Sequence, residues 1–404
     1  MNVKTKMNDY ILKRARELEQ DTIETRTYLH LYPEVSSLEY ETSRYLKKRV
    51  TDLGLIVEEV PGSTGFTALL DTSKPGKTLG IRTDIDALPI DENPYNLMRE
   101  RTCISKNPGA MHACGHDGHM AIILTTIQIM KEMLEDLSGK VYFIFEEGEE
   151  IGAGIDAMIE HLKDKKIDAI YGNHLTSFMK TGTICADEGP VMAGAVLVDF
   201  DILGESGHGS RPDLSVNPIF ATVQVLSALT SAWVNRLDVT KTVTLGLTQI
   251  HGGSANNVIP NKVSVGGSMR FFDIEEGKKA VELTRKVATL TAEAHECTVK
   301  FSPKFGIAGN PVVNDKHLAS IAQKGIDELM PNALVHEETW FASESFNKYR
   351  NIAPTLFVFV GIKNEEYGSG AEHHNDKFDV DENALVTAVL AMTKFGTDFL
   401  TVDK

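Results

Sequence analysis

The sequence predicts an α/β protein: a mostly parallel sheet with helices on both faces, and a smaller domain inserted into it. Through residues 65–175, strand-like apolar runs alternate with helix-like stretches, as in parallel strands joined by crossover helices. Residues 194–302 follow a different order, βαββαβ. A chain of 404 residues is also long for one compact core, so two domains are expected.

The first part of the chain supplies helices and then alternating strands. Residues 8–50 have helical periodicity with a turn at Pro33. Further along, short apolar runs predict strands, and stretches with helical spacing predict helices. The predicted strands are 65–71, 77–86, 139–150 and 167–175, and the predicted helices are 121–137 and 155–166. Sites in such sheets lie beyond the carboxyl ends of the strands.

The inserted part has its own pattern. Its predicted strands are 195–205, 241–253, 262–274 and 297–303, and its predicted helices are 217–237 and 277–296. This order is the split motif of ferredoxin-like domains. Helices and strands such as TLFVFVGI then resume the first domain. We therefore expect a first domain of residues 1–193 and 303–404, and an inserted domain of residues 194–302.

Composition and net charge indicate which classes of partner the protein is expected to bind. Hydrophobic residues make up 42% and charged residues 24%, as in ordinary soluble globular proteins. The formal net charge of -16 argues against nucleic acid or an anionic membrane as a partner. The polar N-terminus lacks the apolar core of a signal peptide, and no segment is expected to span a bilayer. Four scattered cysteines predict a reducing, cytoplasmic setting.

The stretch MHACGHDGHMA, residues 111–121, concentrates thiol and imidazole groups. It holds His112, Cys114, His116 and His119 at the start of the predicted helix 121–137. For any one of them, a capping or buried polar role is the simpler interpretation. Together they favour a site for zinc or another late divalent metal, because both residue types are good ligands for such ions.

Further candidate ligands follow two predicted strands. Glu146, Glu147, Glu149 and Glu150 end strand 139–150, and His174 ends strand 167–175. So many carboxylates repel one another unless they are solvated or neutralised by cations. A solvated acidic loop is the alternative. If the segment is extended, neighbouring carboxylates point to opposite sides, so one can bind metal while the other acts as a general base.

Weaker candidates come from the inserted domain and the C-terminal region. Each of them alone could be turn chemistry or an ordinary surface cation. They are His208 and Ser210, Asn256 and Asn257, Arg270, and the pair His373 and His374.

Taken in order, the motifs resemble those of the peptidase M20 family. They are RTDIDALPI, MHACGHDGHMA, EEGEE, GNHL, GHGSRPDLSVNP, HGGSANNVIP, the Glu-Ser-Phe of ASESFNKY, and HHNDKFDVDENAL. The resemblance is closer to the amidohydrolase branch, which includes hippurate hydrolases, N-acyl-amino-acid amidohydrolases, aminobenzoyl-glutamate hydrolases and auxin-conjugate hydrolases. It implies a zinc-peptidase-like catalytic domain with an inserted lid domain that also dimerises.

Residue by residue, the resemblance implies a dinuclear metal site. The implied ligands of two divalent ions (Zn, Mn, Ni or Co) are Cys114, His116, Glu150, His174 and His374. Glu149 resembles the general base, and His208 a residue that stabilises the oxyanion in the partner subunit's site. Asn257 and Arg270 resemble lid residues that hold the substrate's carboxylate.

The implied function is metal-dependent hydrolysis of the amide bond of N-acyl-amino acids or related small substrates by a metal-bound water. A broader peptidase acting on dipeptides or oligopeptides is a sibling hypothesis. Two others stay open: a non-catalytic carboxylate-binding dimer, and an enzyme in which Cys114 is a nucleophile or a redox thiol. The resemblance implies a homodimer formed through the lid, with tetramers left open.

Departures from the family pattern concern several positions. Many relatives place Gln-Pro-Ala where this chain has Glu146, Glu147 and Gly148, so extra anionic charge is expected near the site. Asn375 and Asp376 stand where Ser-Pro is frequent. More distant relatives have a ligand His where this chain has Arg82. We expect Asp84 to support the site from outside the ligand set, and we expect His112, His119 and His373 to be hydrogen-bonding or structural.

Overall fold

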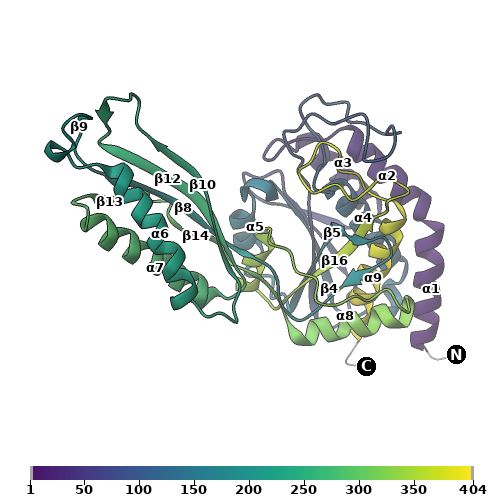
Figure 1. Cartoon of the computed structure of the whole chain (residues 1–404). Coiled ribbons are helices and arrows are strands. Elements are labelled where there is room, and N and C mark those ends of the chain that lie inside the picture. The colour runs from purple at the N-terminus through teal and green to yellow at the C-terminus, as the bar shows by residue number, and fades with distance from the viewer. Residues whose placement is uncertain (1–2, 402–404) are drawn as a thin grey trace. The chain divides into compact units, whose positions relative to one another are not determined.

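The computed structural model describes residues 3–401, and the chain divides into two compact units (Figure 1). The larger unit comprises the chain up to Gly189, Val313–Glu338, and the chain from Lys348 onward. The smaller unit comprises Pro190–Val312 and Thr339–Asn347. It therefore includes segments on both sides of the predicted insertion, residues 194–302.

A seven-stranded sheet with the order β1-β2-β4-β3-β5-β16-β6 forms the centre of the larger unit. Its neighbouring strands β4, β3, β5 and β16 are parallel, whereas the pairs β1/β2, β2/β4 and β16/β6 are antiparallel. The strands are β1 (Ile56–Glu59), β2 (Phe66–Asp71), β3 (Thr78–Asp84), β4 (Lys140–Glu146), β5 (Ala169–Lys180), β6 (Ile184–Cys185) and β16 (Thr355–Lys363). The predicted α/β class with a mostly parallel sheet is confirmed.

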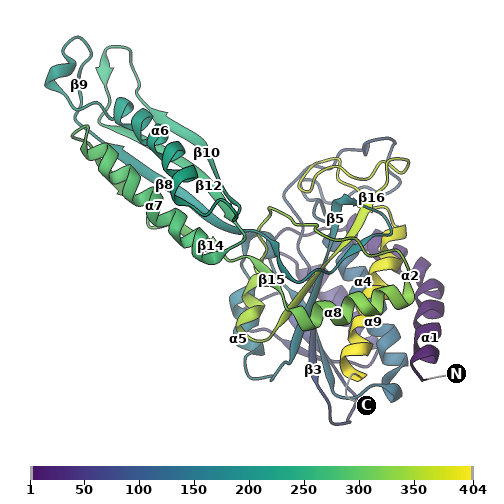
Figure 2. The same ribbon diagram turned by 60° about the horizontal axis from the view of Figure 1, so that its bottom comes forward.

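Helices pack on both faces of this sheet because its strands bury alternating apolar side chains. Phe66, Ala68 and Leu70 of β2 belong to the main core, whereas Thr67 between them faces His161 of α5 at 3.2 Å. In Figure 2, α5 accordingly lies across the sheet from α4 and α9. The helices are α1 (Val3–Glu17), α2 (Glu19–Leu31), α3 (Tyr40–Asp52), α4 (His116–Glu132), α5 (Ile155–Leu162), α8 (Lys316–Leu329) and α9 (Asn383–Thr401).

Helix α9 is an exception to the expectation that no segment is apolar and long enough to span a bilayer. By length and composition alone, Asn383–Thr401 meets that criterion. However, 78% of its apolar window is buried inside the protein, where the helix packs against α1, α4 and α8. A helix that is hydrophobic on all sides is typical of a protein core, and packing accounts for its composition.

The smaller unit has the predicted βαββαβ order. Its antiparallel sheet has the strand order β10-β12-β8-β13, with β14 (Gly306–Gly309) also paired to β8. On β8, Val196, Val198, Phe200 and Ile202 alternate with more exposed residues and form a separate core with α6 and α7. The elements are β8 (Gly194–Leu203), α6 (Pro218–Arg236), β10 (Val243–Gly252), β12 (Lys262–Phe271), α7 (Ile274–Glu293) and β13 (Thr298–Phe301).

The segment after β4 differs from the prediction. Strand β4 ends at Glu146, and Glu149–Ile151 form a short 3-10 turn rather than extended chain. Gly148 and Gly152 flank this turn with φ of 58° and 63°, a region that glycine enters at little cost. The prediction that Glu149 and Glu150 alternate along a strand was therefore wrong.

Two buried carboxylates hold this turn by its backbone. The Gly148 N–H donates to Glu39 Oε1 at 2.9 Å, and the Glu150 N–H donates to Asp86 Oδ2 at 3.1 Å. The Thr64 hydroxyl donates to the other Glu39 oxygen at 2.9 Å. Because these acceptors come from distant parts of the chain, the position of the turn depends on the folded unit as a whole.

The carboxyl group of Glu39 gives a pH-dependent prediction. Burial is the main cause that raises its pKa from 4.5 to about 7. A raised pKa means that the fold favours the neutral acid, so this stabilisation is full below pH 4.5 and is lost as pH rises toward 7. Relative to Glu39→Gln, the wild type should lose roughly 3 kcal/mol of unfolding free energy between pH 4.5 and 7. Urea unfolding of both chelated proteins measures this; an unchanged difference between them at the two pH values would contradict it.

Candidate metal centre

The five side chains expected to bind metal lie together in the larger unit. Cys114 Sγ is 3.5 Å from His174 Nε2, and His374 Nε2 is 3.2 Å from Glu150 Oε2. His116 Nε2 lies 3.8 Å from the other Glu150 oxygen. They come from the start of α4, the turn after β4, strand β5 and the C-terminal loop, so the fold brings together residues that are far apart in sequence.

The ligand atoms form overlapping groups in which all atoms lie within 4.8 Å of one another. One group is Cys114, His116 and His174; a second is Cys114, Glu150 and His374; a third is His116, Glu149 and Glu150. The groups share members, as expected if neighbouring cations were to use common ligands. Thiolate, imidazole and carboxylate donors together suit zinc and related divalent metals.

Two orphaned atoms support the fit to a metal. His116 Nε2 and Glu150 Oε1 are buried and have no hydrogen-bond partner within residues 3–401. They nevertheless face each other across 3.8 Å. Leaving buried polar atoms unsatisfied is costly, and a cation would satisfy both at once. The residues present therefore fit a divalent metal ion.

The site is strongly anionic without a cation. Burial and then the negative charge of Glu150 raise the pKa of the Cys114 thiol well above its usual range. Burial lowers the pKa of His116, but Asp84, Asp86 and Glu150 outweigh it and raise the value to about 10. Both groups therefore carry protons at neutral pH, and a metal would displace them.

Hydrogen bonds orient two of the imidazoles. His116 Nδ1 donates to the Asp86 carbonyl oxygen at 2.9 Å, which leaves Nε2 toward Glu150. His174 Nδ1 donates to the Leu175 carbonyl oxygen at 2.8 Å, which leaves Nε2 toward Cys114. Burial lowers the pKa of His174 well below its usual range, so this ring is neutral. Such bonds fix the tautomer that a metal ligand needs.

The carboxylate nearest His116 is Asp86 rather than Asp84. Asp86 Oδ1 is 3.2 Å from His116 Nδ1, whereas Asp84 Oδ1 is 3.7 Å away. Asp84 Oδ1 instead accepts a hydrogen bond from His119 Nδ1 at 2.8 Å. Asp84 therefore acts on His116 through its charge and on His119 through a hydrogen bond, and sequence reasoning missed the closer carboxylate of Asp86.

Of the three ambiguous histidines, two have structural hydrogen bonds. His119 Nε2 accepts from the Leu175 N–H at 3.0 Å, so both of its nitrogens are engaged. His373 Nε2 donates to the Leu175 carbonyl oxygen at 2.9 Å. His112 is buried with neither ring nitrogen bonded to a described residue, and nothing in the structure assigns it a role.

The first two glutamates of the acidic block are bound away from the cluster. Glu146 Oε2 accepts from Arg82 Nε at 2.8 Å and from the Tyr349 hydroxyl at 2.7 Å. Glu147 accepts from the Ser63 hydroxyl and the Thr64 N–H. Arg82 thus neutralises the extra charge that was expected from Glu146.

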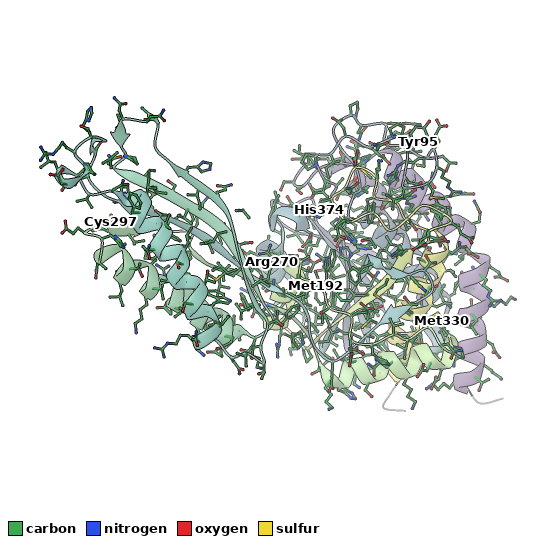
Figure 3. All side chains as sticks on the ribbon, in the orientation of Figure 1. Tyr95, Met192, Arg270, Cys297, Met330 and His374 are labelled. Carbon is green, nitrogen blue, oxygen red and sulfur yellow. The ribbon has the colours of Figure 1, made fainter. Side chains whose placement is uncertain are left out.

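The candidate substrate residues lie in the smaller unit, whereas the candidate metal ligands lie in the larger unit. His208, in β9 (Gly207–His208), pairs with β11 (Val258–Ile259), and the Gly209 N–H donates to the Asn257 carbonyl oxygen at 2.8 Å. Arg270 on β12, labelled in Figure 3, donates through Nε to the Phe341 carbonyl oxygen at 3.1 Å. Burial lowers the Arg270 pKa. Their roles toward substrate stay predictions.

Comparison with known proteins identifies the family. The sequence model described as peptidase family M20/M25/M40 matches residues 80–396. Thermostable carboxypeptidase 1 of Saccharolobus solfataricus is 32% identical over 95% of this chain and 97% of its own length. N-acetylcysteine deacetylase of Bacillus subtilis is 33% identical over 91% and 93% of the two chains.

A solved structure shows the same fold. The Bacillus subtilis YXEP protein, described as a dinuclear metal binding peptidase from the M20 family, matches with a TM-score of 0.83 at 29% identity. The match covers 95% of this chain and 99% of that chain. Together with the family match over most of its length, this shows that the chain belongs to peptidase family M20/M25/M40 and is a hydrolase.

Proposed function

We propose that the chain is a dinuclear metal amidohydrolase that cleaves the amide bond of N-acyl-amino acids or related small peptide-like substrates. The observation that carries the proposal is the convergence of Cys114, Glu150 and three histidines with two orphaned atoms among them. The similarity to N-acetylcysteine deacetylase supports an N-acyl-amino acid as substrate.

Cys114, His116, Glu150, His174 and His374 would hold two divalent cations (Zn, Mn, Ni or Co). When bound, such ions polarise the substrate carbonyl and lower the pKa of water. Glu149, grouped with His116 and Glu150, accepts a proton from the attacking water and delivers it to the departing nitrogen. The new C–O bond forms first and places negative charge on the former carbonyl oxygen; when Glu149 returns the proton to the nitrogen, the C–N bond breaks and the carbonyl re-forms, which yields a carboxylate and an amine.

The residues of the smaller unit would bind the substrate. The Ser210 N–H donates to His208 Nδ1 at 3.1 Å, which leaves the proton on Nε2 free to donate to the developing oxyanion of the partner's substrate. The planar guanidinium of Arg270 can bind both oxygens of the substrate's carboxylate. Asn257 would help to hold the same group.

Three alternatives are weaker. The similarity to a carboxypeptidase favours peptides as further substrates, and only a substrate panel separates the two classes. A non-catalytic role is disfavoured because Glu149 and all five ligand positions are present. Cys114 is a poor nucleophile, since burial and neighbouring carboxylates raise its pKa and keep it protonated.

A homodimer through the smaller unit is supported by an exposed apolar row on α6. Phe220, Val223 and Val234 are 67%, 55% and 68% exposed, and they share one helix face with Ser227 and Thr230 at heptad spacing. Strand β10 is an edge strand that pairs only with β12 within the described chain. Unpaired edges and apolar rows are both typical of association surfaces.

The cytoplasm is the compartment that the cysteines favour. All four cysteines are free, and three of them are buried. Free thiols persist in a reducing environment. The net charge of -16 further supports small molecules, rather than nucleic acids or membranes, as partners.

The catalytic assignment predicts that Glu149→Gln loses activity but keeps its metal. We expect turnover to fall by about 10²–10⁴-fold, because the proton acceptor is lost while the ligand set stays intact. Glu147→Gln is the matched control, since its carboxylate is bound to Ser63 and Thr64. The assay uses acetyl-, benzoyl- and aminobenzoyl-amino acids alongside dipeptides, with chelated enzyme reloaded with each metal.

Metal analysis of the same samples completes this test. An active Glu149→Gln variant with normal metal content would refute the base assignment. Full activity after chelation would instead point to a thiol enzyme, because Cys114 chemistry does not need the metal.

The dimer proposal predicts that Phe220→Asp converts the protein to a monomer, because a charge in the apolar row is left desolvated on pairing. Val239→Asp, at a position 85% exposed just beyond α6, is the control and should stay dimeric. Sedimentation equilibrium measures the mass of each. A monomeric wild type, or a dimeric Phe220→Asp variant, would rule out this surface.

A further inference from the structure

His374 is the metal-ligand candidate with the least support from regular structure. It lies in the loop between β16 and α9, its side chain is 52% exposed, and its φ is 62°. A non-glycine residue keeps a left-handed conformation only when its surroundings fix it. Something near His374 must therefore hold this loop.

A compact turn follows His374. The Phe378 N–H donates to the Asn375 carbonyl oxygen at 2.9 Å, and the Lys377 N–H donates to the Asn375 side chain at 2.8 Å. Asp376 occupies the second position of this β-turn. Within residues 3–401, the Asp376 N–H donates no hydrogen bond.

A second loop, residues 92–101, holds this turn; we call it the clamp segment (Tyr95 and His374 are labelled in Figure 3). The Asn93 N–H donates to the Asp376 carbonyl oxygen at 3.1 Å, and Asn93 Nδ2 donates to Asp376 Oδ2 at 3.0 Å. The Arg101 guanidinium donates to the Phe378 carbonyl oxygen at 2.7 Å and to that of Asp376 at 3.3 Å.

The clamp segment is itself anchored in the interior. Arg101 Nη1 lies 3.1 Å from Glu92 Oε1, and both side chains are only 1% exposed. His30 Nε2 on α2 contacts the same Glu92 oxygen at 2.9 Å. Burial and Arg26 lower the pKa of His30, yet its hydrogen bonds to Asp117 and Glu92 raise it overall. The clamp segment is thereby tied to α2 and to the start of α4.

We infer that Asn93 and Arg101 are positioning residues that order the turn after His374 and so fix this imidazole beside Glu150. The inference rests on the proposed ligand role of His374 for its effect on metal binding. Its structural part, the ordering of residues 372–378, stands without any metal.

The test uses Asn93→Ala and Asp376→Ala in the full chain. In the metal-free protein, we expect faster amide hydrogen exchange of residues 372–378 in both variants. In calorimetric titrations with Mn²⁺, we expect the Kd of the weaker site to rise about 10-fold, as for other residues that orient metal ligands. Glu100→Ala, an exposed position of the clamp segment, is the matched control.

A second substitution tests whether restoring order to the turn restores metal affinity even though the Asn93 contact is missing. Proline is favoured at the second position of such turns because its φ is already fixed, and Asp376→Pro removes no backbone hydrogen bond. In the double variant Asn93→Ala/Asp376→Pro, exchange and Kd should return toward wild type. If the double variant exchanges its amide hydrogens as fast as Asn93→Ala and has the same raised Kd for Mn²⁺, the inference is overturned.

Results from the single variants and from His374→Ala test the inference and the proposed ligand role separately. Wild-type exchange and Kd in both single variants, or equal loosening by Glu100→Ala, overturn the inference. His374→Ala tests the proposed function separately: if it binds Mn²⁺ like the wild type, the ligand role is wrong, while exchange of residues 372–378 still shows whether the clamp segment orders the loop.

Discussion

Neutralisation of buried negative charge is the constraint on which the rest of this structure depends. Asp84 and Glu146 are fully buried and share the guanidinium of Arg82. Glu150 has no guanidinium beside it; its neighbours are the imidazoles of His116 and His374 at 3.8 and 3.2 Å, and the negative charges of this site raise the pKa of both Cys114 and His116. Isolated charges are costly to bury. The Arg82 guanidinium neutralises Asp84 and Glu146, whereas the carboxylate of Glu150 lies where a divalent metal ion would fit.

The sheet topology explains why these groups meet. Strands β4, β3 and β5 are parallel neighbours, so their carboxyl ends share one edge, as open α/β sheets generally arrange their sites. Asp84 ends β3, the Glu149 turn follows β4, and His174 lies within β5. Helix α4 begins at His116 beside the same edge. Most of the candidate site residues therefore come from this sheet edge and the start of α4, whereas His374 comes from the loop between β16 and α9.

The features that could be predicted from the sequence are those that depend on local residue patterns and on the order of motifs along the chain. The alternating strands, the βαββαβ unit and the clustered thiol and imidazoles all left clear periodic or compositional signals. Pairings over long separations left none: Glu39 bonds to Gly148 across 109 residues. The conformation of Glu149 and Glu150 was mispredicted because the acidic run continued a strand pattern, although Gly148 marked its end. The role of Asp86 could have been predicted, since it lies two residues after Asp84 in the same motif.

Polar contacts in the larger unit lead from the residue after His116 to the loop that carries His374. Asp117, next to His116, accepts from Arg26 at 2.7 Å and from His30 at 2.8 Å. His30 in turn contacts Glu92, whose neighbour in the clamp segment bonds to the turn after His374. The start of α4 and the C-terminal loop are thus joined by one chain of polar contacts. Because a buried polar group that loses its partner is costly, these contacts favour one arrangement in which both the start of α4 and the C-terminal loop are held in place.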